Sequence, residues 1–158
     1  MSAWVMMTSM SNSVVVRPIE AGDHEAWQRL FHAYRTFYEY DEEQDVVDRV
    51  WGWINDETHE TNALVALVDD EVVGFAHHRE FARPSSGKRG LYLDDLFTEP
   101  DQRRKGVGRA LISALGEMAQ WRGYNKVRWI TAEDNHTAQR LYDDLAEKTT
   151  WVTYDYRV

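Results

Sequence analysis

The chain has 158 residues, of which 43% are hydrophobic and 28% charged, which is typical of one soluble globular domain. Its formal net charge of −9 argues against a general nucleic-acid binder, whose affinity would come from an excess of lysine and arginine, but is compatible with a cationic substrate. The absence of cysteine excludes disulfides, thiolate metal sites and a cysteinyl acyl-enzyme.

The histidines follow no metal-binding spacing, and we expect no metal site. His77 and His78 are adjacent on an expected strand, so they should face opposite sides of it. No segment approaches the ~20 apolar residues of a membrane span, and residues 1–13 lack the features of a secretory signal. We therefore expect 1–13 to be a flexible lead-in and 14–158 a single domain. We also expect a cytoplasmic protein that binds neither nucleic acid nor membrane.

The first part of the chain predicts a strand and two helices. Residues 14–19 form an apolar segment with a proline near its end, which is typical of a strand. Asp23 is a candidate N-cap of a helix, because aromatic and apolar side chains recur behind it at helical spacing. A second helix is expected between Val46 and Ile54. The carboxylate-rich run of residues 39–45 is either a solvated connection between these helices or a negatively charged lip that draws in an amine.

Antiparallel strands are expected next. Residues 62–68 and 72–78 should form a hairpin across a short acidic turn. Residues 83–89 are expected to be a polar loop that leads to a central strand at 91–98. The sheet should therefore begin antiparallel.

A cationic glycine loop, Arg103–Gly108, follows the central strand and precedes a helix whose apolar face runs from Val107 to Trp121. The first N–H groups of a helix are unpaired and lie at its positive end, and glycine lets a ligand approach the backbone closely. The sequence therefore predicts an anion cradle. A Rossmann loop does not fit, because Leu111 stands at the third small position, and the end of a Walker A loop is missing.

The last third predicts a strand, a helix and a closing strand. Residues 126–132 follow a crossover helix, so they should lie parallel to 91–98. Asn135 should cap a short helix that ends at about Glu147. Residues 151–157 alternate in side-chain type, which indicates a final strand. Together the elements predict one mixed α/β domain.

Two motifs carry a resemblance to a known family. The loop Arg103–Gly108 resembles the Arg/Gln-x-x-Gly-x-Gly/Ala signature of the GNAT N-acetyltransferases, and Asn135–Tyr142 resembles their second signature, Asn-x-x-Ala/Ser-x-x-Leu/Phe-Tyr. The resemblance covers about residues 14–156 in matching order. It implies an α/β (α+β) GNAT fold, with a mixed, mostly antiparallel central sheet flanked by helices and a splayed parallel strand pair at the cofactor cleft. It also implies acetyl-CoA as co-substrate and no metal.

The resemblance further implies which residues hold acetyl-CoA. The loop amides would bind the pyrophosphate, the asparagine would contact the pantetheine arm, and the end of the central strand would offer backbone groups. The implied cofactor-binding residues are Leu96, Phe97, Thr98, Arg103, Arg104, Lys105, Gly106, Val107, Gly108, Arg109, Asn135 and Ala138. Two departures stand out: Arg104 occupies a position where many relatives have glycine, and the usual Gly-Phe after Tyr142 is absent, which leaves the shape of the acceptor pocket open.

The residue types suit acetyl transfer to an amine. An alkylammonium must lose a proton before it attacks, and the departing thiolate is helped by a nearby acid. Tyr142 is the candidate acid, although taken alone it would be a core tyrosine on an amphipathic helix. Asp94, directly or through a water, is the candidate base or ammonium anchor. Asp94 and Asp95 alternate along the strand, so only one is expected to face the cleft. Without cysteine, direct attack in a ternary complex is expected.

The acceptor is the least defined part. Tyr38, Glu39 and the strand around Asp94 resemble the diamine (spermidine/spermine) N-acetyltransferase branch, which implies that these three residues bind the substrate. The same strand pattern also resembles fungal histone-acetyltransferase-like members. We expect a small cationic amine of the diamine or polyamine type; the alternatives are a protein or peptide lysine, an amino acid, or a regulatory domain that binds acyl-CoA without turnover. Seven tryptophans and eight tyrosines leave apolar surface that a homodimer could bury.

Overall fold

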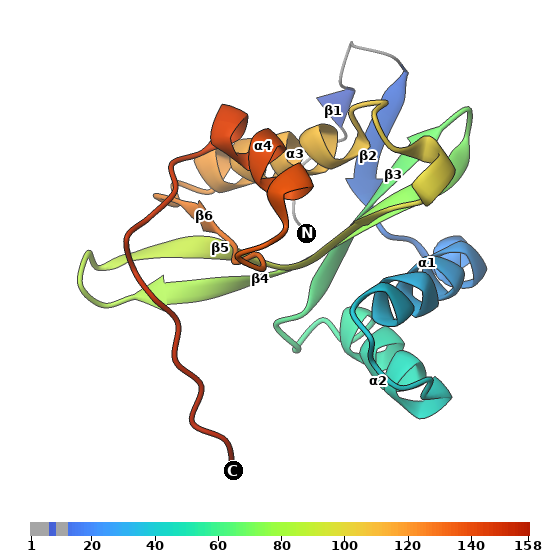
Figure 1. Ribbon diagram of the computed structural model, residues 1–158, viewed down its shortest axis with the longest axis horizontal. Helices are drawn as coiled ribbons and strands as arrows, with labels where there is room; N and C mark the ends of the chain where they lie inside the picture. Colours follow the sequence, from blue (N-terminus) through green and yellow to red (C-terminus); the bar gives the residue numbers. More distant parts are fainter. Residues whose placement is uncertain (1–6, 9–12) are drawn as a thin grey trace.

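The computed structural model describes residues 7–8 and 13–158 (Figure 1). Most of the expected N-terminal lead-in, residues 1–13, lies outside them. The described strands form one sheet in sequential order: β1 (Met7–Thr8), β2 (Val14–Pro18), β3 (Asn62–Val68), β4 (Glu71–Arg83), β5 (Lys88–Thr98) and β6 (Val127–Arg128). The helices are α1 (His24–Phe37), α2 (Gln44–Ile54), α3 (Val107–Trp121) and α4 (His136–Leu145), with short 3-10 turns at Ala21–Asp23 and Pro100–Gln102.

The sheet is antiparallel except at one pair. β1 to β5 pair antiparallel with their neighbours, whereas β5 and β6 are parallel because α3 connects them as a crossover helix. This parallel pair is in register only at Leu91 with Val127 and at Tyr92 with Arg128. Beyond these positions β6 ends, and no further residues pair with β5 along this edge in the described part of the chain. The predicted fold class, including the parallel pair, is confirmed.

Helices cover both faces of the sheet (Figure 1). α1 and α2 pack on one face over an aromatic cluster that includes Trp27, Phe31 and Phe75. α3 and α4 pack on the other face over an aliphatic cluster built around Leu91 and Leu111. Alternate residues of the central strands divide between the two clusters, since successive side chains of a strand point to opposite faces. The domain is a three-layer sandwich with the candidate motifs at one end of the sheet.

Three expected elements differ in the structure. The strand predicted at 126–132 is limited to Val127–Arg128, because its later residues have no strand partner in the described part of the chain. Residues 151–157 have strand-like alternation but form no strand, since a strand requires a hydrogen-bonded neighbour. The polar loop predicted at 83–89 is a shorter turn, because β4 and β5 remain paired as far as Arg83 and Lys88.

Asp23 is also placed differently from its prediction. Its side chain does not cap α1 but accepts hydrogen bonds from Arg17 (2.7 and 2.9 Å) and from the backbone N–H of Glu20 (2.8 Å). The bond from the Arg17 guanidinium holds the pKa of Asp23 below its usual value, even though burial opposes it. Asp23 therefore fixes the turn between β2 and α1 instead of the helix end itself.

Within residues 7–8 and 13–158, every helix is too short or too polar to cross a lipid bilayer.

Candidate active site

The N-terminus of α3 is an open cradle of backbone amides. Gly106 adopts a left-handed conformation (φ 80°), and no atom lies within 4 Å of the position that a Cβ would take there. The first hydrogen bond of the helix runs from the Ala110 N–H to the Gly106 carbonyl (2.9 Å), so the amides between these residues have no intrahelical partner. Unpaired amides at the positive end of a helix are suited to a phosphate or pyrophosphate.

Three cationic side chains surround this cradle. The Arg103 guanidinium lies over the rings of Phe37 and Phe97, at 5.6 and 5.7 Å from their centroids. Lys105 donates a hydrogen bond to Gln102 (2.8 Å). Arg109 forms an ion pair with Asp144 of α4 (3.0 Å). These contacts join the predicted loop to its neighbours: Arg103 contacts the end of α1, and Arg109 contacts α4.

The backbone conformation of Arg104 gives a physical reason why many relatives have glycine at this position. Its φ of 68° lies in the left-handed region, where a Cβ is crowded by the neighbouring carbonyl at a cost of roughly 1–2 kcal/mol. We expect Arg104→Gly to have a free energy of unfolding about 1 kcal/mol higher than Arg104→Ala, as measured by urea denaturation. Both variants remove the same charge, so the comparison isolates the Cβ. At an ordinary backbone position alanine is the more stable by about 0.5–1 kcal/mol, and that order would contradict the assignment.

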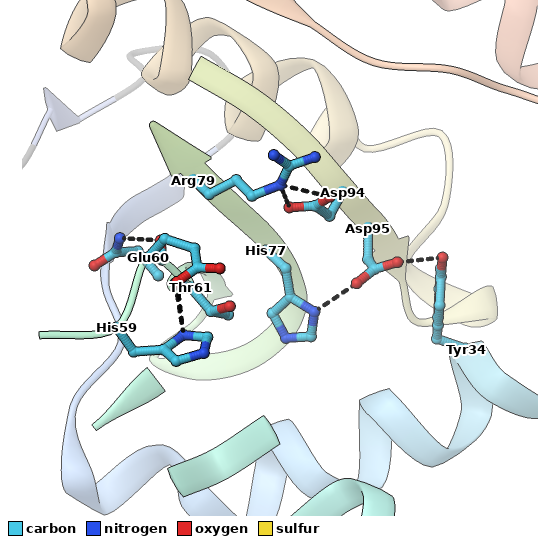
Figure 2. Close-up of polar contacts among 9 residues, drawn as sticks. Tyr34, His59, Glu60, Thr61, His77, Arg79, Asp94 and Asp95 are labelled. Atoms are coloured by element: carbon cyan, nitrogen blue, oxygen red, sulfur yellow. Dashed lines mark hydrogen bonds and ion pairs between the residues drawn. The ribbon is translucent and has the colours of Figure 1, made fainter. Parts of the chain in front are cut away.

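A buried hydrogen-bond network lies on the face of β5 that α1 covers. Figure 2 shows its members His77, Asp95 and Tyr34. The Trp27 Nε1–H donates to His77 Nε2 (2.9 Å), and an indole nitrogen can only donate. The Nε2 atom of His77 is therefore the unprotonated acceptor. The proton lies on Nδ1, which donates to Asp95 Oδ2 (2.8 Å). The Tyr34 hydroxyl donates to the other oxygen of Asp95 (2.5 Å). Residues from α1, β4 and β5 are held together by this chain.

Asp95 is thereby an ionised carboxylate with both oxygens occupied. Burial alone would raise the pKa of Asp95, but the hydrogen bonds from His77 and Tyr34 outweigh burial and hold it below its usual value. Burial and the adjacent Asp95 raise the pKa of Tyr34, so this hydroxyl keeps its proton. Asp95 is consequently better suited to hold Tyr34 in place than to accept a proton from a substrate.

Asp94 is the more available of the two carboxylates. Its oxygens lie 3.2 Å from Nε of Arg79, and its side chain is about one-third exposed. Burial raises the pKa of Asp94, and Arg79 opposes this shift in part. A carboxylate with a raised pKa is a better proton acceptor than an ordinary one. The geometry is therefore consistent with the predicted role of base or ammonium anchor.

The expectation that only one of these aspartates faces the cleft is wrong. His77 pairs with Asp95 and His78 with Leu93, so Asp94 is the extra residue of a β-bulge. The bulge breaks the side-chain alternation, and both carboxylates line one cavity of about 500 Å³. The other lining residues come from α1, α2, β4 and the turn before β3: Phe31, Val50, Trp53, His59, Glu60, Thr61, His77 and Arg79.

Tyr142, the candidate acid, lies on α4 with its ring edge against Trp129 (centroids 5.3 Å apart, 70°). Burial raises its pKa, and the nearby Tyr38 adds to the shift, so Tyr142 is protonated and able to donate. The ring of Tyr38 is tilted by 51° against that of Tyr34 (centroids 4.8 Å apart), and burial followed by the charge of Asp95 raises the pKa of Tyr38. Tyr38 is therefore near both Asp95 and Tyr142, and its role in binding the substrate stays a prediction.

Asn135 and Glu39, two further predicted site residues, lie in a helix cap and an exposed turn. Asn135 caps α4 as expected, because its side chain accepts the Ala138 N–H (3.4 Å). Glu39 is exposed in a left-handed turn after α1 (φ 60°) and does not line the cavity that holds Asp94 and Asp95. Residues 39–43 form a connection between α1 and α2 in which Arg35 pairs with Glu43 (3.0 Å).

The residues that sequence reasoning missed are Tyr34, His77 and Arg79. Tyr34 belongs to an amphipathic helix and His77 to a strand, and no local pattern pairs them with Asp95, which lies 61 and 18 positions away. A bulge has no sequence signature here, so Arg79 opposite Asp94 could not be found. No group of three potential metal ligands is present among the residues that the structure describes.

Comparisons with known proteins agree with this geometry. Residues 27–146 match the acetyltransferase (GNAT) family. The chain is 31% identical over 147 residues to a D-amino-acid N-acetyltransferase of Saccharomyces cerevisiae, covering 92% of this chain and 91% of the relative. It is 32% identical over 69 residues to a thialysine N-epsilon-acetyltransferase of Caenorhabditis elegans, covering 40% and 43% of the two chains. Its fold is similar to that of a ribosomal-protein-alanine N-acetyltransferase from Brucella melitensis, with a TM-score of 0.78, 23% identity and coverage of 92% and 99%.

Proposed function

Because the chain belongs to the GNAT family of N-acetyltransferases, we propose that it uses acetyl-CoA to acetylate the primary amine of a small cationic molecule. The observation that carries the proposal is the cavity of about 500 Å³ that holds Asp94 and Asp95. Its volume suits a small ligand, and its carboxylates suit an ammonium group.

The residues around the N-terminus of α3 fit the pyrophosphate of acetyl-CoA. The open space above Gly106 and the unpaired amides that follow it form a cradle, and Arg103, Lys105 and Arg109 supply positive charge beside it. The end of β6 leaves backbone groups of Leu96 to Thr98 to bind the rest of the arm. The thioester would then lie between the carboxylate network and Tyr142.

In the proposed reaction, Asp94 binds the ammonium group and takes its proton, directly or through a water. The freed amine attacks the thioester carbonyl carbon in a ternary complex, forming a C–N bond, and the C–S bond then breaks. Tyr142 gives its proton to the departing thiolate, and the second proton of the nitrogen leaves to solvent, from which Tyr142 is protonated again. Asp95, whose oxygens are occupied, holds Tyr34 and thereby Tyr38 in position.

The cavity suits two classes of acceptor, and the side chain of Arg79 distinguishes between them. Glu60, Asp94 and Asp95 favour a diamine or polyamine, which carries several positive charges. Arg79 lines the same cavity and favours an amino acid, whose carboxylate could pair with the guanidinium while its amine meets Asp94. The names of the relatives with D-amino-acid and thialysine activity support this second candidate.

We expect Arg79→Gln to separate these acceptors in a thiol-release assay with diamines, polyamines, amino acids and lysine peptides. For an amino acid the variant should lower kcat/KM by about 10-fold or more, because a charge-assisted hydrogen bond is lost. For a diamine it should leave kcat/KM unchanged or raise it, because Asp94 is no longer neutralised. Arg89→Gln is the matched control, since Arg89 pairs with Glu80 on the same hairpin and does not line the cavity.

Each result decides between stated alternatives. Use of lysine peptides alone would refute a small-molecule acceptor. If acetyl-CoA binds but no amine releases thiol, the chain is a regulatory acyl-CoA-binding domain instead of an enzyme acting on amines. The cytoplasmic location and the homodimer stay predictions, and fractionation and solution mass test them.

A further inference from the structure

The end of α1 contacts the loop that precedes α3. Phe37, the last residue of the helix, is 56% exposed, and the centroid of its ring lies 5.6 Å from the guanidinium carbon of Arg103. A single exposed phenylalanine is common on protein surfaces, so its exposure alone assigns it no role. Its contact is more informative, because the face of an aromatic ring attracts a cation that lies within about 6 Å of the ring centroid.

Arg103 is held in place without losing its charge. The ring of Phe97 lies 5.7 Å from the same guanidinium, and the Nε–H of Arg103 donates to the carbonyl of Thr98 (3.4 Å). Among the residues that the structure describes, no carboxylate forms an ion pair with Arg103, and its terminal N–H groups form no hydrogen bond. A contact with aromatic rings therefore leaves both the charge and these donors available to an anion.

The two other cations beside the cradle are held differently. Arg109 pairs with Asp144 (3.0 Å), and Lys105 donates to Gln102 (2.8 Å). An anion that binds Arg109 must compete with this carboxylate. Arginine has many rotamers, and fixing one of them before a ligand arrives reduces the entropy lost on binding. Of these three side chains, Arg103 is the one that is already positioned and has no carboxylate partner in the described part of the chain.

We propose that Phe37 is a positioning residue of the cradle at the N-terminus of α3: it holds the Arg103 guanidinium so that its terminal N–H groups can bind a phosphate of the cofactor. Phe37 itself does not touch the ligand. Phe97 is buried in the core, whereas Phe37 belongs to neither core cluster, so its contribution is the contact with Arg103. The inference rests on the proposed function for the identity of the ligand, acetyl-CoA, but not for the contact.

The same contact connects the loop to Tyr38, a predicted substrate-binding residue. The ring of Phe37 meets that of Tyr38 edge to face (centroids 5.1 Å apart, 79°). Burial and then the charge of Asp95 raise the pKa of Tyr38, and the charge of Arg103 opposes them. An anion bound to Arg103 would compensate that charge and so act on Tyr38 through it. Phe37 therefore lies where α1 can link the cofactor loop to the acceptor.

The first experiment compares the full chain with Phe37→Leu for two anions, acetyl-CoA by calorimetry and inorganic pyrophosphate by NMR titration. We expect the variant to bind both about 2- to 5-fold more weakly, which corresponds to the usual strength of an exposed cation–π contact. Phe37→Trp should keep the affinity, because its ring also attracts a cation. Tyr40→Leu is the matched control: Tyr40 is 59% exposed and its ring lies 5.3 Å from Arg35, so the same kind of contact is lost within the α1–α2 connection.

The second experiment shows whether Phe37 acts through Arg103. Arg103→Ala, with and without Phe37→Leu, completes a double-mutant cycle. Without the guanidinium a positioning residue has nothing to hold, so Phe37→Leu should cause no further loss of affinity. A general effect on α1 would cause the same loss in both backgrounds, and that result would overturn the proposal. Thermal unfolding confirms that each variant is folded.

The two anions distinguish failure of this inference from failure of the proposed function. If the full chain binds both and Phe37→Leu weakens neither, Phe37 has no positioning role, although the use of acetyl-CoA stands. If the full chain binds pyrophosphate but not acetyl-CoA, the proposed function is wrong, and the cycle with pyrophosphate still decides the role of Phe37. Binding of neither anion would overturn both.

Discussion

Turnover of the Tyr142→Phe variant is expected to fall by ~10²-fold or more, with affinity for acetyl-CoA nearly unchanged. The substitution removes only the proton that the thiolate would receive. Burial and the neighbouring Tyr38 raise the pKa of this tyrosine, so its hydroxyl carries a proton at neutral pH. The substitution therefore removes a group that is able to donate. Steady-state kinetics should show kcat and kcat/KM reduced together, because the interaction is made in the transition state.

Tyr124→Phe serves as the matched control. Tyr124 is also a partly buried tyrosine whose pKa is raised, by burial and then by Glu80, and it packs against the same core cluster as Tyr142, but its neighbours are Glu80 and Arg122. Its variant should keep full turnover. If Tyr142→Phe also keeps full turnover across the pH range, then Tyr142 only packs against Trp129 and the acid must be another group.

Local motifs predicted the glycine loop before α3 and the cap of α4, for a physical reason. The loop before α3 depends on glycine at a left-handed position and on amides at a helix start, and both follow from neighbouring residues in the chain. Asn135 likewise caps α4 within its own turn. Interactions over a few residues leave a readable pattern, so their geometry could be predicted from the sequence.

The arrangement around Asp94 and Asp95 depends on contacts between distant residues, and less of its geometry could be predicted from the sequence. The bulge at Asp94 arises from how β4 and β5 pair, and it brings both aspartates to one cavity. The Trp27–His77–Asp95–Tyr34 network joins three elements, which no spacing rule connects. The strand predicted at residues 151–157 is wrong, because alternation alone does not make a strand and these residues have no hydrogen-bonded strand neighbour in the structure.

Acetyl-CoA binding is expected to fall by about 10- to 100-fold in Gly108→Val, because charge-assisted hydrogen bonds to the cofactor are lost. A Cβ on Gly108 would lie 3.5 Å from Leu141 of α4 and 3.9 Å from Leu96 of β5, so it would occupy the space between these elements without a clash in the protein. The added methyl groups would then obstruct the approach of the ligand to the helix amides. Gly106→Val should also weaken binding, but its φ of 80° makes backbone strain a second cause.

Gly116→Val on the same helix is the control for Gly108→Val. No atom lies within 4 Å of a Cβ at Gly116, and it is exposed more than two turns from the cradle, so its affinity should match that of the unchanged chain. Calorimetry measures the affinity, and thermal unfolding confirms that each variant is folded. Arg103→Ala and Arg109→Ala should weaken binding less and leave the residual affinity less sensitive to salt, because each removes one charge and no amide. An unchanged affinity in folded Gly108→Val would remove the N-terminus of α3 as the cofactor cradle, whatever the arginine variants show.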